Sequence, residues 1–165
     1  MELPVRRPNR LKGYDYSQNG AYFATVCTKN RHEILGKIAV GATAPGRPQV
    51  ELTPLGICVE ETIQQAHHGG VKIDKYVVMP NHIHMITILT TDGRAAITSG
   101  DRGRSPIQYI VRNIKSFVTK WAGFSPWQKS FHDHIIRDDA EYQRISQYID
   151  ENPKRWAEDK FYNDM

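Results

Sequence analysis

The sequence contains little cysteine and no long apolar segment, and both absences limit what the protein can be. Only two cysteines, Cys27 and Cys58, occur among 165 residues, and neither has the spacing of a CxxC pair or a zinc ligand set. We therefore expect free thiols in a reducing compartment, not a disulfide framework or a zinc finger. No apolar run reaches the roughly 18 residues that a membrane-spanning helix needs, and no apolar stretch follows the basic N-terminal residues. These absences predict a soluble, cytoplasmic protein.

Acidic residues are also in the minority. The chain has 22 Lys and Arg residues against 18 Asp and Glu, which gives a formal net charge of +4. A positive excess favours a polyanionic partner without identifying it. The length fits a single domain over residues 1–165. Residues 1–19 of it are interpreted as a basic N-terminal arm.

Residue patterns predict seven regular elements. Strands are predicted over residues 21–29, 71–79, 82–89 and 130–136, where β-branched and aromatic residues are frequent. Helices are predicted over residues 54–68, 106–121 and 139–152, where apolar periodicity and helix-starting residues coincide. Residues 41–50 are rich in turn formers and predict a surface hairpin or loop, and residues 90–105 predict a flexible loop. The order of elements predicts an α+β fold, with a ferredoxin-like antiparallel sheet and helices packed on one face.

Two histidines lie in the best-defined hairpin, VVMPNHIHMI. Alternate residues of a strand point to the same face about 6.5 Å apart, so His82 and His84 can reach one ion while Ile83 faces the opposite layer. For an isolated pair of this kind, ordinary surface or core histidines are the more frequent explanation. A metal site also needs a further ligand, and catalysis needs a nucleophile nearby.

The last predicted helix, YQRISQYIDEN, offers both groups. Tyr148 and Asn152 are four residues apart, which places a phenol and an amide on one helix face about 6 Å apart. Taken alone the pair is weak evidence, because tyrosine is common in amphipathic helices and asparagine often ends them. Tyr142 lies off this line and lacks a comparable polar partner.

These segments together resemble the HUH-type tyrosine transposases, most closely their REP-associated branch. The resemblance covers most of the chain from about residue 20 to residue 153. It is found in the segments AYFATVCTKNR, VVMPNHIHMI, IVRNIKSFVTKW, PWQKSFHDHIIRD and YQRISQYIDENP. The combination is far more specific than the histidine pair alone.

The resemblance implies an enzyme, with specific roles for four residues. It implies that His82 and His84 bind a divalent metal, Mg²⁺ or Mn²⁺, that Asn152 completes the coordination, and that Tyr148 is the nucleophile. Members of this family cut single-stranded DNA at palindromic hairpins, form a 5′-phosphotyrosine intermediate and can rejoin strands. The implied function is therefore a metal-dependent endonuclease and strand transferase.

Basic residues outside this set are candidates for DNA binding through phosphates, with little base specificity. They are Arg6, Arg7, Arg10, Lys12, Arg102, Arg104, Arg112 and Lys115. An ordinary solvated arm or helix face explains several of them equally well. A second histidine pair, His132 and His134, is expected to have a structural or DNA-contacting role, and Trp127 is expected to pack the turn between helix and strand.

Two other functions use the same features. A non-catalytic single-strand or hairpin DNA-binding protein derived from a transposase would keep the sheet, because such sheets can stack bases on aromatic residues. Such a protein would have lost catalysis, and the presence of all four residues, His82, His84, Tyr148 and Asn152, argues against that loss. A replication initiator or relaxase would share the chemistry but usually carries further domains. A monomer is favoured over a homodimer.

Overall fold

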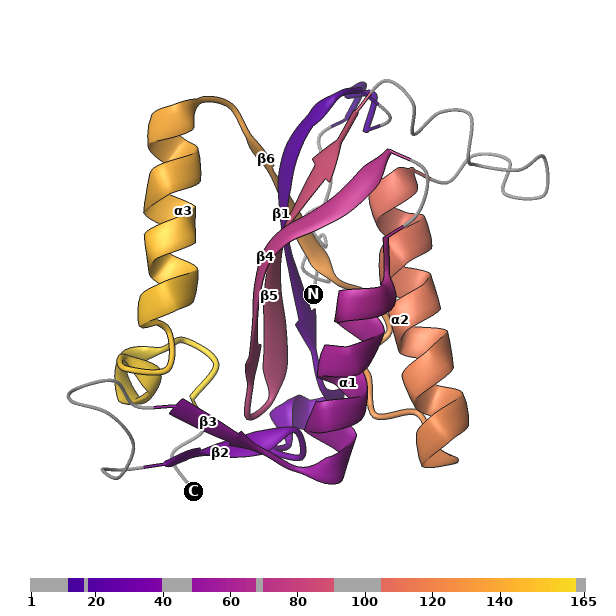
Figure 1. Ribbon diagram of the computed structural model, residues 1–165, viewed down its shortest axis with the longest axis vertical. Helices are drawn as coiled ribbons and strands as arrows, with labels where there is room; N and C mark the ends of the chain where they lie inside the picture. The colour runs from indigo at the N-terminus through magenta and orange to yellow at the C-terminus, as the bar shows by residue number, and fades with distance from the viewer. Residues whose placement is uncertain (1–11, 17, 40–48, 68–69, 91–104, 163–165) are drawn as a thin grey trace, which may run out of the picture.

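The computed structural model describes residues 12–16, 18–39, 49–67, 70–90 and 105–162, and its centre is an antiparallel sheet (Figure 1). Four strands form this sheet in the order β4-β5-β1-β6. They are β1 (Gly20–Cys27), β4 (Val71–Met79), β5 (His82–Leu89) and β6 (His132–Ile136). A smaller sheet pairs β2 (Gly36–Ala39) with β3 (Gln49–Leu52). The helices are α1 (Pro54–Gln65), α2 (Pro106–Ala122) and α3 (Asp139–Glu151).

The sheet separates the helices into two layers. Helices α1 and α2 cover one face, where Ile83 and Met85 of β5 join the main hydrophobic core. Helix α3 lies on the other face (Figure 1), where its buried Ile149 packs with Ile86 and Ile136. The predicted α+β class and ferredoxin-like antiparallel sheet are confirmed. The expected packing on one face holds for α1 and α2, whereas the apolar stripe of α3 covers the second face.

Local sequence signals start and stop these helices. The Thr53 side chain accepts a hydrogen bond from the backbone N–H of Gly56 at the start of α1, and Asp138 does the same for α3. Ser105 and Gln108 form a capping box at the start of α2. Helix α2 is followed by its C-cap, Gly123, whose φ of 76° is a left-handed conformation that glycine adopts at little cost.

Most predicted elements occur where the sequence placed them. The strands of the β4–β5 hairpin have the predicted bounds, whereas α1 ends at Gln65 instead of residue 68 and β6 begins at His132 instead of residue 130. The predicted hairpin or loop at 41–50 lies mostly outside the described residues, between β2 and β3. Most of the predicted arm (1–19) and of the predicted loop (90–105) also lies outside them.

Two absences noted in the sequence have structural counterparts. Cys27 and Cys58 are buried, free thiols, as predicted. Within the described ranges, no helix has both the length and the apolar character needed to cross a membrane.

Candidate active site

The two histidines of β5 lie side by side on the sheet face that α3 covers. His82 is 0% exposed and His84 is 1% exposed, and their ring centroids are 4.4 Å apart. Ile83, between them, points into the opposite layer. The predicted convergence of the two imidazoles is therefore present in the fold.

Asn81 determines how His82 is presented. The Asn81 amide nitrogen donates to the backbone carbonyls of Arg31 (3.1 Å) and Phe161 (2.7 Å), so its oxygen faces the Nδ1 atom of His82 at 2.8 Å. Because this oxygen can only accept, Nδ1 carries the ring proton and Nε2 keeps its lone pair. Nε2 is buried and has no hydrogen-bond partner among the described residues. His82 is thus held in the tautomer that a metal ligand requires.

His84 has a hydroxyl partner at each ring nitrogen. Its Nδ1 atom lies 2.8 Å from the hydroxyl of Thr25 on β1, and its Nε2 atom lies 3.3 Å from the hydroxyl of Tyr148 on α3. Burial lowers the pKa of His82 to about 4, against an opposing effect of Asp159. Burial, together with the neighbouring His82, lowers the pKa of His84 well below its usual range. Both rings are therefore neutral near pH 7, as metal-binding imidazoles must be.

Tyr148 and Asn152 approach the histidines from α3. Asn152 is 2% exposed, and its side-chain oxygen is buried without a hydrogen-bond partner in the described part of the chain. Tyr148 is 38% exposed, so its hydroxyl can be reached from solvent. Burial, with the nearby Asp159 carboxylate, raises the pKa of Tyr148 to about 12. The phenol is therefore protonated at neutral pH.

Asp159 completes the cluster, and the sequence did not point to it. Its carboxylate accepts hydrogen bonds from the hydroxyl of Tyr148 (3.1 Å) and from the amide of Asn152 (2.7 Å). Ligand atoms of His82, His84 and Asp159 all lie within 4.8 Å of one another. Asp159 follows a short 3-10 turn, Trp156–Glu158, whose Trp156 packs with Cys27 and Met79. Asp159 lies near the histidines only because Trp156 packs against Cys27 and Met79. The sequence around Asp159 therefore contains no local pattern that predicts its position in the site.

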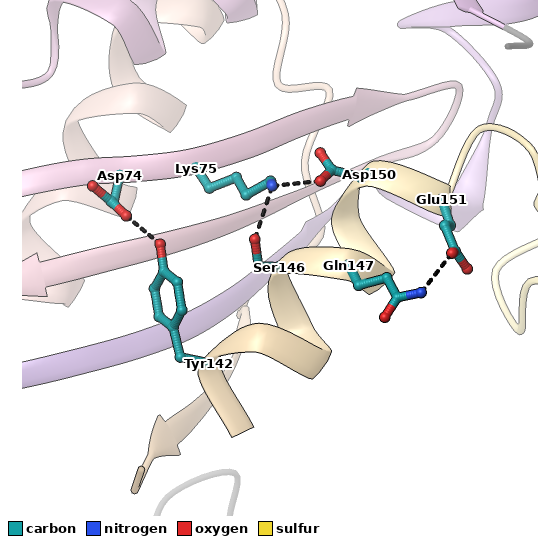
Figure 2. Close-up of polar contacts among 7 residues, drawn as sticks. All are labelled: Asp74, Lys75, Tyr142, Ser146, Gln147, Asp150 and Glu151. Carbon is teal, nitrogen blue, oxygen red and sulfur yellow. Dashed lines mark hydrogen bonds and ion pairs between the residues drawn. The ribbon is translucent and has the colours of Figure 1, made fainter. Parts of the chain in front are cut away.

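The polar contacts in Figure 2 fix α3 on β4. The Tyr142 hydroxyl donates to the Asp74 carboxylate, and the Lys75 amine contacts Ser146 (2.8 Å) and Asp150 (2.6 Å). Neighbouring strand residues normally point to opposite faces, but a register shift between Ile73 and Lys75 lets both Asp74 and Lys75 face α3. Tyr142 is thereby occupied away from the histidines. The structure brings the Tyr148 hydroxyl, and not that of Tyr142, to His84.

A pocket of about 600 Å³ opens between α3 and the C-terminal segment beside this cluster. Its lining includes Tyr148, Asn152 and Asp159. The lining also contains the cations Arg144, Arg155 and Lys160. It contains the acids Glu151, Glu158 and Asp159 as well, and Arg155 pairs with Glu151 (3.1 Å), so the phenol lies beside charges of both signs.

The predicted DNA-binding residues are placed only in part. Lys12 and Arg112 are exposed, whereas Arg6, Arg7, Arg10, Arg102 and Arg104 lie outside the described residues. The amine of Lys115 donates to the backbone carbonyls of Gln128 (2.7 Å) and Ser130 (3.0 Å), so it joins α2 to the following segment.

The second histidine pair and Trp127 are also placed. His134 lies 2.6 Å from Glu141 and links β6 to α3, which is a structural contact, whereas His132 is exposed. Trp127 is buried and pairs with Thr28 at the end of β1, so it packs the turn between helix and strand as expected.

Comparison with known proteins identifies a relative and a fold. No protein-family model matches the chain. An uncharacterized protein of Haemophilus influenzae is 36% identical over 176 residues, which cover 96% of this chain and 94% of that protein. The two proteins belong to one family.

A solved structure shares the fold of this chain. A REP-associated tyrosine transposase bound to a REP hairpin matches with a TM-score of 0.61 and 22% identity over 92% of this chain and 77% of that one. The chain has the fold of a REP-associated tyrosine transposase. A candidate transposase from Deinococcus radiodurans is 19% identical over 85% of this chain and 94% of that one, with a TM-score of 0.42. The transposase resemblance of the sequence thus extends to the fold, with His82 and His84 on β5 and Tyr148 on α3.

Proposed function

We propose that the protein is a metal-dependent endonuclease and strand transferase that cuts single-stranded DNA at palindromic hairpins. The observation that supports this most directly is the meeting of His82, His84, Tyr148 and Asn152, which come from two distant elements of the chain. Hairpin DNA as substrate is supported by the neighbouring transposase, which was solved with a REP hairpin. Such a substrate would place the activity in the cytoplasm.

His82 and His84 would hold a divalent metal, Mg²⁺ or Mn²⁺, through their Nε2 atoms. The residues fit such an ion, because the His82 Nε2 and the Asn152 side-chain oxygen are buried acceptors without a partner in the described structure. Asp159 adds a carboxylate within reach of both rings. When bound, the metal polarises a phosphoryl oxygen and neutralises its charge. Oxygen ligands from Asn152 and Asp159 suit Mg²⁺, and the imidazoles suit Mn²⁺.

Tyr148 would carry out the covalent step. Its oxygen forms a bond to phosphorus while the bond from phosphorus to the 3′ oxygen breaks, which leaves the 5′ end of the DNA on the tyrosine. The phenolic proton leaves to solvent, which reaches the partly exposed Tyr148, and the departing 3′ oxygen takes a proton from solvent. Attack by the 3′-hydroxyl of another strand reverses these changes and joins two ends.

A denaturing gel tests this function. The protein is incubated with labelled single-stranded hairpin oligonucleotides in Mn²⁺ or in EDTA, as wild type, Tyr148→Phe and Tyr142→Phe. We expect a covalent protein–DNA band that needs Mn²⁺, disappears in Tyr148→Phe and persists in Tyr142→Phe. Hairpin binding without any band would instead support the non-catalytic DNA-binding protein.

The predicted basic residues and the oligomeric state complete the proposal. Phosphate contacts are proposed for Arg6, Arg7, Arg10, Lys12, Arg102, Arg104 and Arg112, with a smaller contribution from Lys115 because its amine is already engaged. A monomer suffices for catalysis, since one chain supplies the histidines, the tyrosine and both oxygen ligands.

A further inference from the structure

The carboxylate of Asp159 is held in place by residues that follow it in the chain. Its Oδ1 atom accepts a hydrogen bond from the backbone N–H of Phe161 (2.8 Å). The Phe161 carbonyl accepts from the buried amide of Asn81 (2.7 Å), and the Phe161 ring packs with Cys27 and Met79. These contacts fix Asp159 relative to the β4–β5 hairpin and leave its second oxygen, Oδ2, to face α3.

The Oδ2 atom of Asp159 determines which end of the Asn152 amide faces the histidines. A carboxylate can only accept hydrogen bonds, so the group that lies 2.7 Å from Oδ2 must be the amide nitrogen. The side-chain oxygen of Asn152 is then turned away from Asp159. It is buried without a hydrogen-bond partner among the described residues, and the Asn152 side chain lies beside His82. An oxygen in this position can bind a cation, whereas an amide nitrogen cannot.

The same oxygen of Asp159 also takes the proton of the Tyr148 hydroxyl. That hydroxyl lies 3.1 Å from Asp159 Oδ2 and 3.3 Å from the Nε2 atom of His84. A phenol has a single proton to donate, and a charged acceptor forms the stronger hydrogen bond. Donation to Asp159 therefore keeps the Tyr148 proton away from the lone pair of His84 Nε2.

We propose that Asp159 is a positioning residue, whose carboxylate takes the donor hydrogens of Asn152 and Tyr148 so that the Asn152 oxygen and His84 Nε2 are presented to the metal. The proposal rests on the proposed function. In the described part of the chain, Phe161, Asn152 and Tyr148 occupy three of the about four acceptor positions of this carboxylate. Asp159 can therefore also contact the ion, but its positioning role acts through the other side chains.

A double-mutant cycle on Mn²⁺ affinity tests this role. Isothermal titration calorimetry measures the dissociation constant of Mn²⁺ for wild type, Asp159→Ala, Asn152→Ala and the double variant. Glu158→Ala is the matched control, because Glu158 is an exposed acid that precedes Asp159 and lines the same pocket. Circular dichroism checks that each protein is folded. Asp159→Asn, which keeps the shape of the side chain, replaces Asp159→Ala if the alanine variant does not fold.

The expected signature is that the two substitutions do not add. Loss of a group that orients a metal ligand weakens metal affinity about 10- to 100-fold, and we expect a loss of this size for Asp159→Ala alone. In the Asn152→Ala background there is no amide to orient, so we expect the loss to be smaller by more than about twofold. Equal losses in the two backgrounds would overturn the proposal and leave Asp159 as an independent ligand. Unchanged affinity in Asp159→Ala would overturn it too.

Heteronuclear NMR of the metal-free protein gives a second measurement, which needs no metal. The side-chain amide signal of Asn152 is assigned by its absence from the spectrum of Asn152→Ala. We expect this signal to shift in Asp159→Ala, because the amide loses its charged acceptor, and to stay in place in Glu158→Ala. A signal that does not move in Asp159→Ala would show that Asp159 does not hold the amide, which would overturn the proposal.

The covalent adduct separates this proposal from the proposed function. If wild type forms the Tyr148-dependent adduct but the losses of Mn²⁺ affinity add, the positioning role is refuted and the catalytic function stands. If the losses do not add and the Asn152 signal shifts, but no adduct forms, the positioning role stands and the catalytic function fails. Absence of Mn²⁺ binding by wild type would overturn both.

Discussion

Replacing Asn81 by alanine tests how the fold presents His82. The Asn81 side chain is fully buried and makes three hydrogen bonds, to the carbonyls of Arg31 and Phe161 and to His82. Each such bond contributes about 0.5–1.5 kcal/mol net, so we expect the free energy of unfolding to fall by about 2–4 kcal/mol. The His82 ring also loses the acceptor that sets its tautomer. Loss of such a partner typically weakens metal affinity about 10- to 100-fold.

Two assays separate these effects. Urea unfolding in EDTA measures stability without metal, and isothermal titration calorimetry with Mn²⁺ measures the dissociation constant of folded protein. Asn113→Ala, at an exposed position on α2, is the matched control and should change neither quantity. An Asn81→Ala variant that loses stability but binds Mn²⁺ as tightly as wild type would refute the tautomer argument.

Three further predictions concern the helix contacts, the backbone and the metal. Hydrogen bonds from Lys72 and Tyr142 lower the pKa of Asp74 in the folded protein. The ionised carboxylate therefore stabilises the fold at any pH above the pKa of Asp74 in the unfolded chain. This stabilisation is lost as the pH falls through the lowered pKa of the folded state. Asp74→Asn should therefore lose about 1 kcal/mol at pH 7, and its Tm should fall less than that of wild type below about pH 4. Gly56→Ala should destabilise by about 1–3 kcal/mol or more in thermal unfolding, because its Cβ would lie 1.9 Å from the backbone oxygen of Leu35. Mn²⁺ at about 100 times its Kd should stabilise wild type by about 2.7 kcal/mol, whereas His84→Ala should show no such gain; equal gains would argue against the histidine site.

The sequence predicted those parts of the site that depend on local geometry. Strand periodicity placed His82 and His84 on one face, and helix periodicity placed Tyr148 and Asn152 on one face. The β4–β5 hairpin followed directly from its two β-branched runs. These features depend only on residues close in the chain.

The parts that the sequence could not predict depend on contacts between distant segments. Asp159 reaches the histidines because Trp156 and Phe161 pack against Cys27 and Met79. The side of the sheet that α3 covers is not encoded in its own periodicity. The same holds for the register shift that turns Asp74 towards Tyr142, since a bulge is a property of two paired strands.

Mass spectrometry of the trapped intermediate tests the central claim most directly. After incubation with a single-stranded hairpin and Mn²⁺, the adduct is digested with nuclease and trypsin. Cleavage after Arg137, Arg144 and Lys154 places Tyr142 in the peptide 138–144 and Tyr148 in the peptide 145–154. We predict that the residual nucleotide mass is found on the peptide 145–154, at Tyr148, and only when metal was present. Nucleotide mass on the peptide 138–144, or cleavage of the hairpin without any modified tyrosine, would contradict the mechanism.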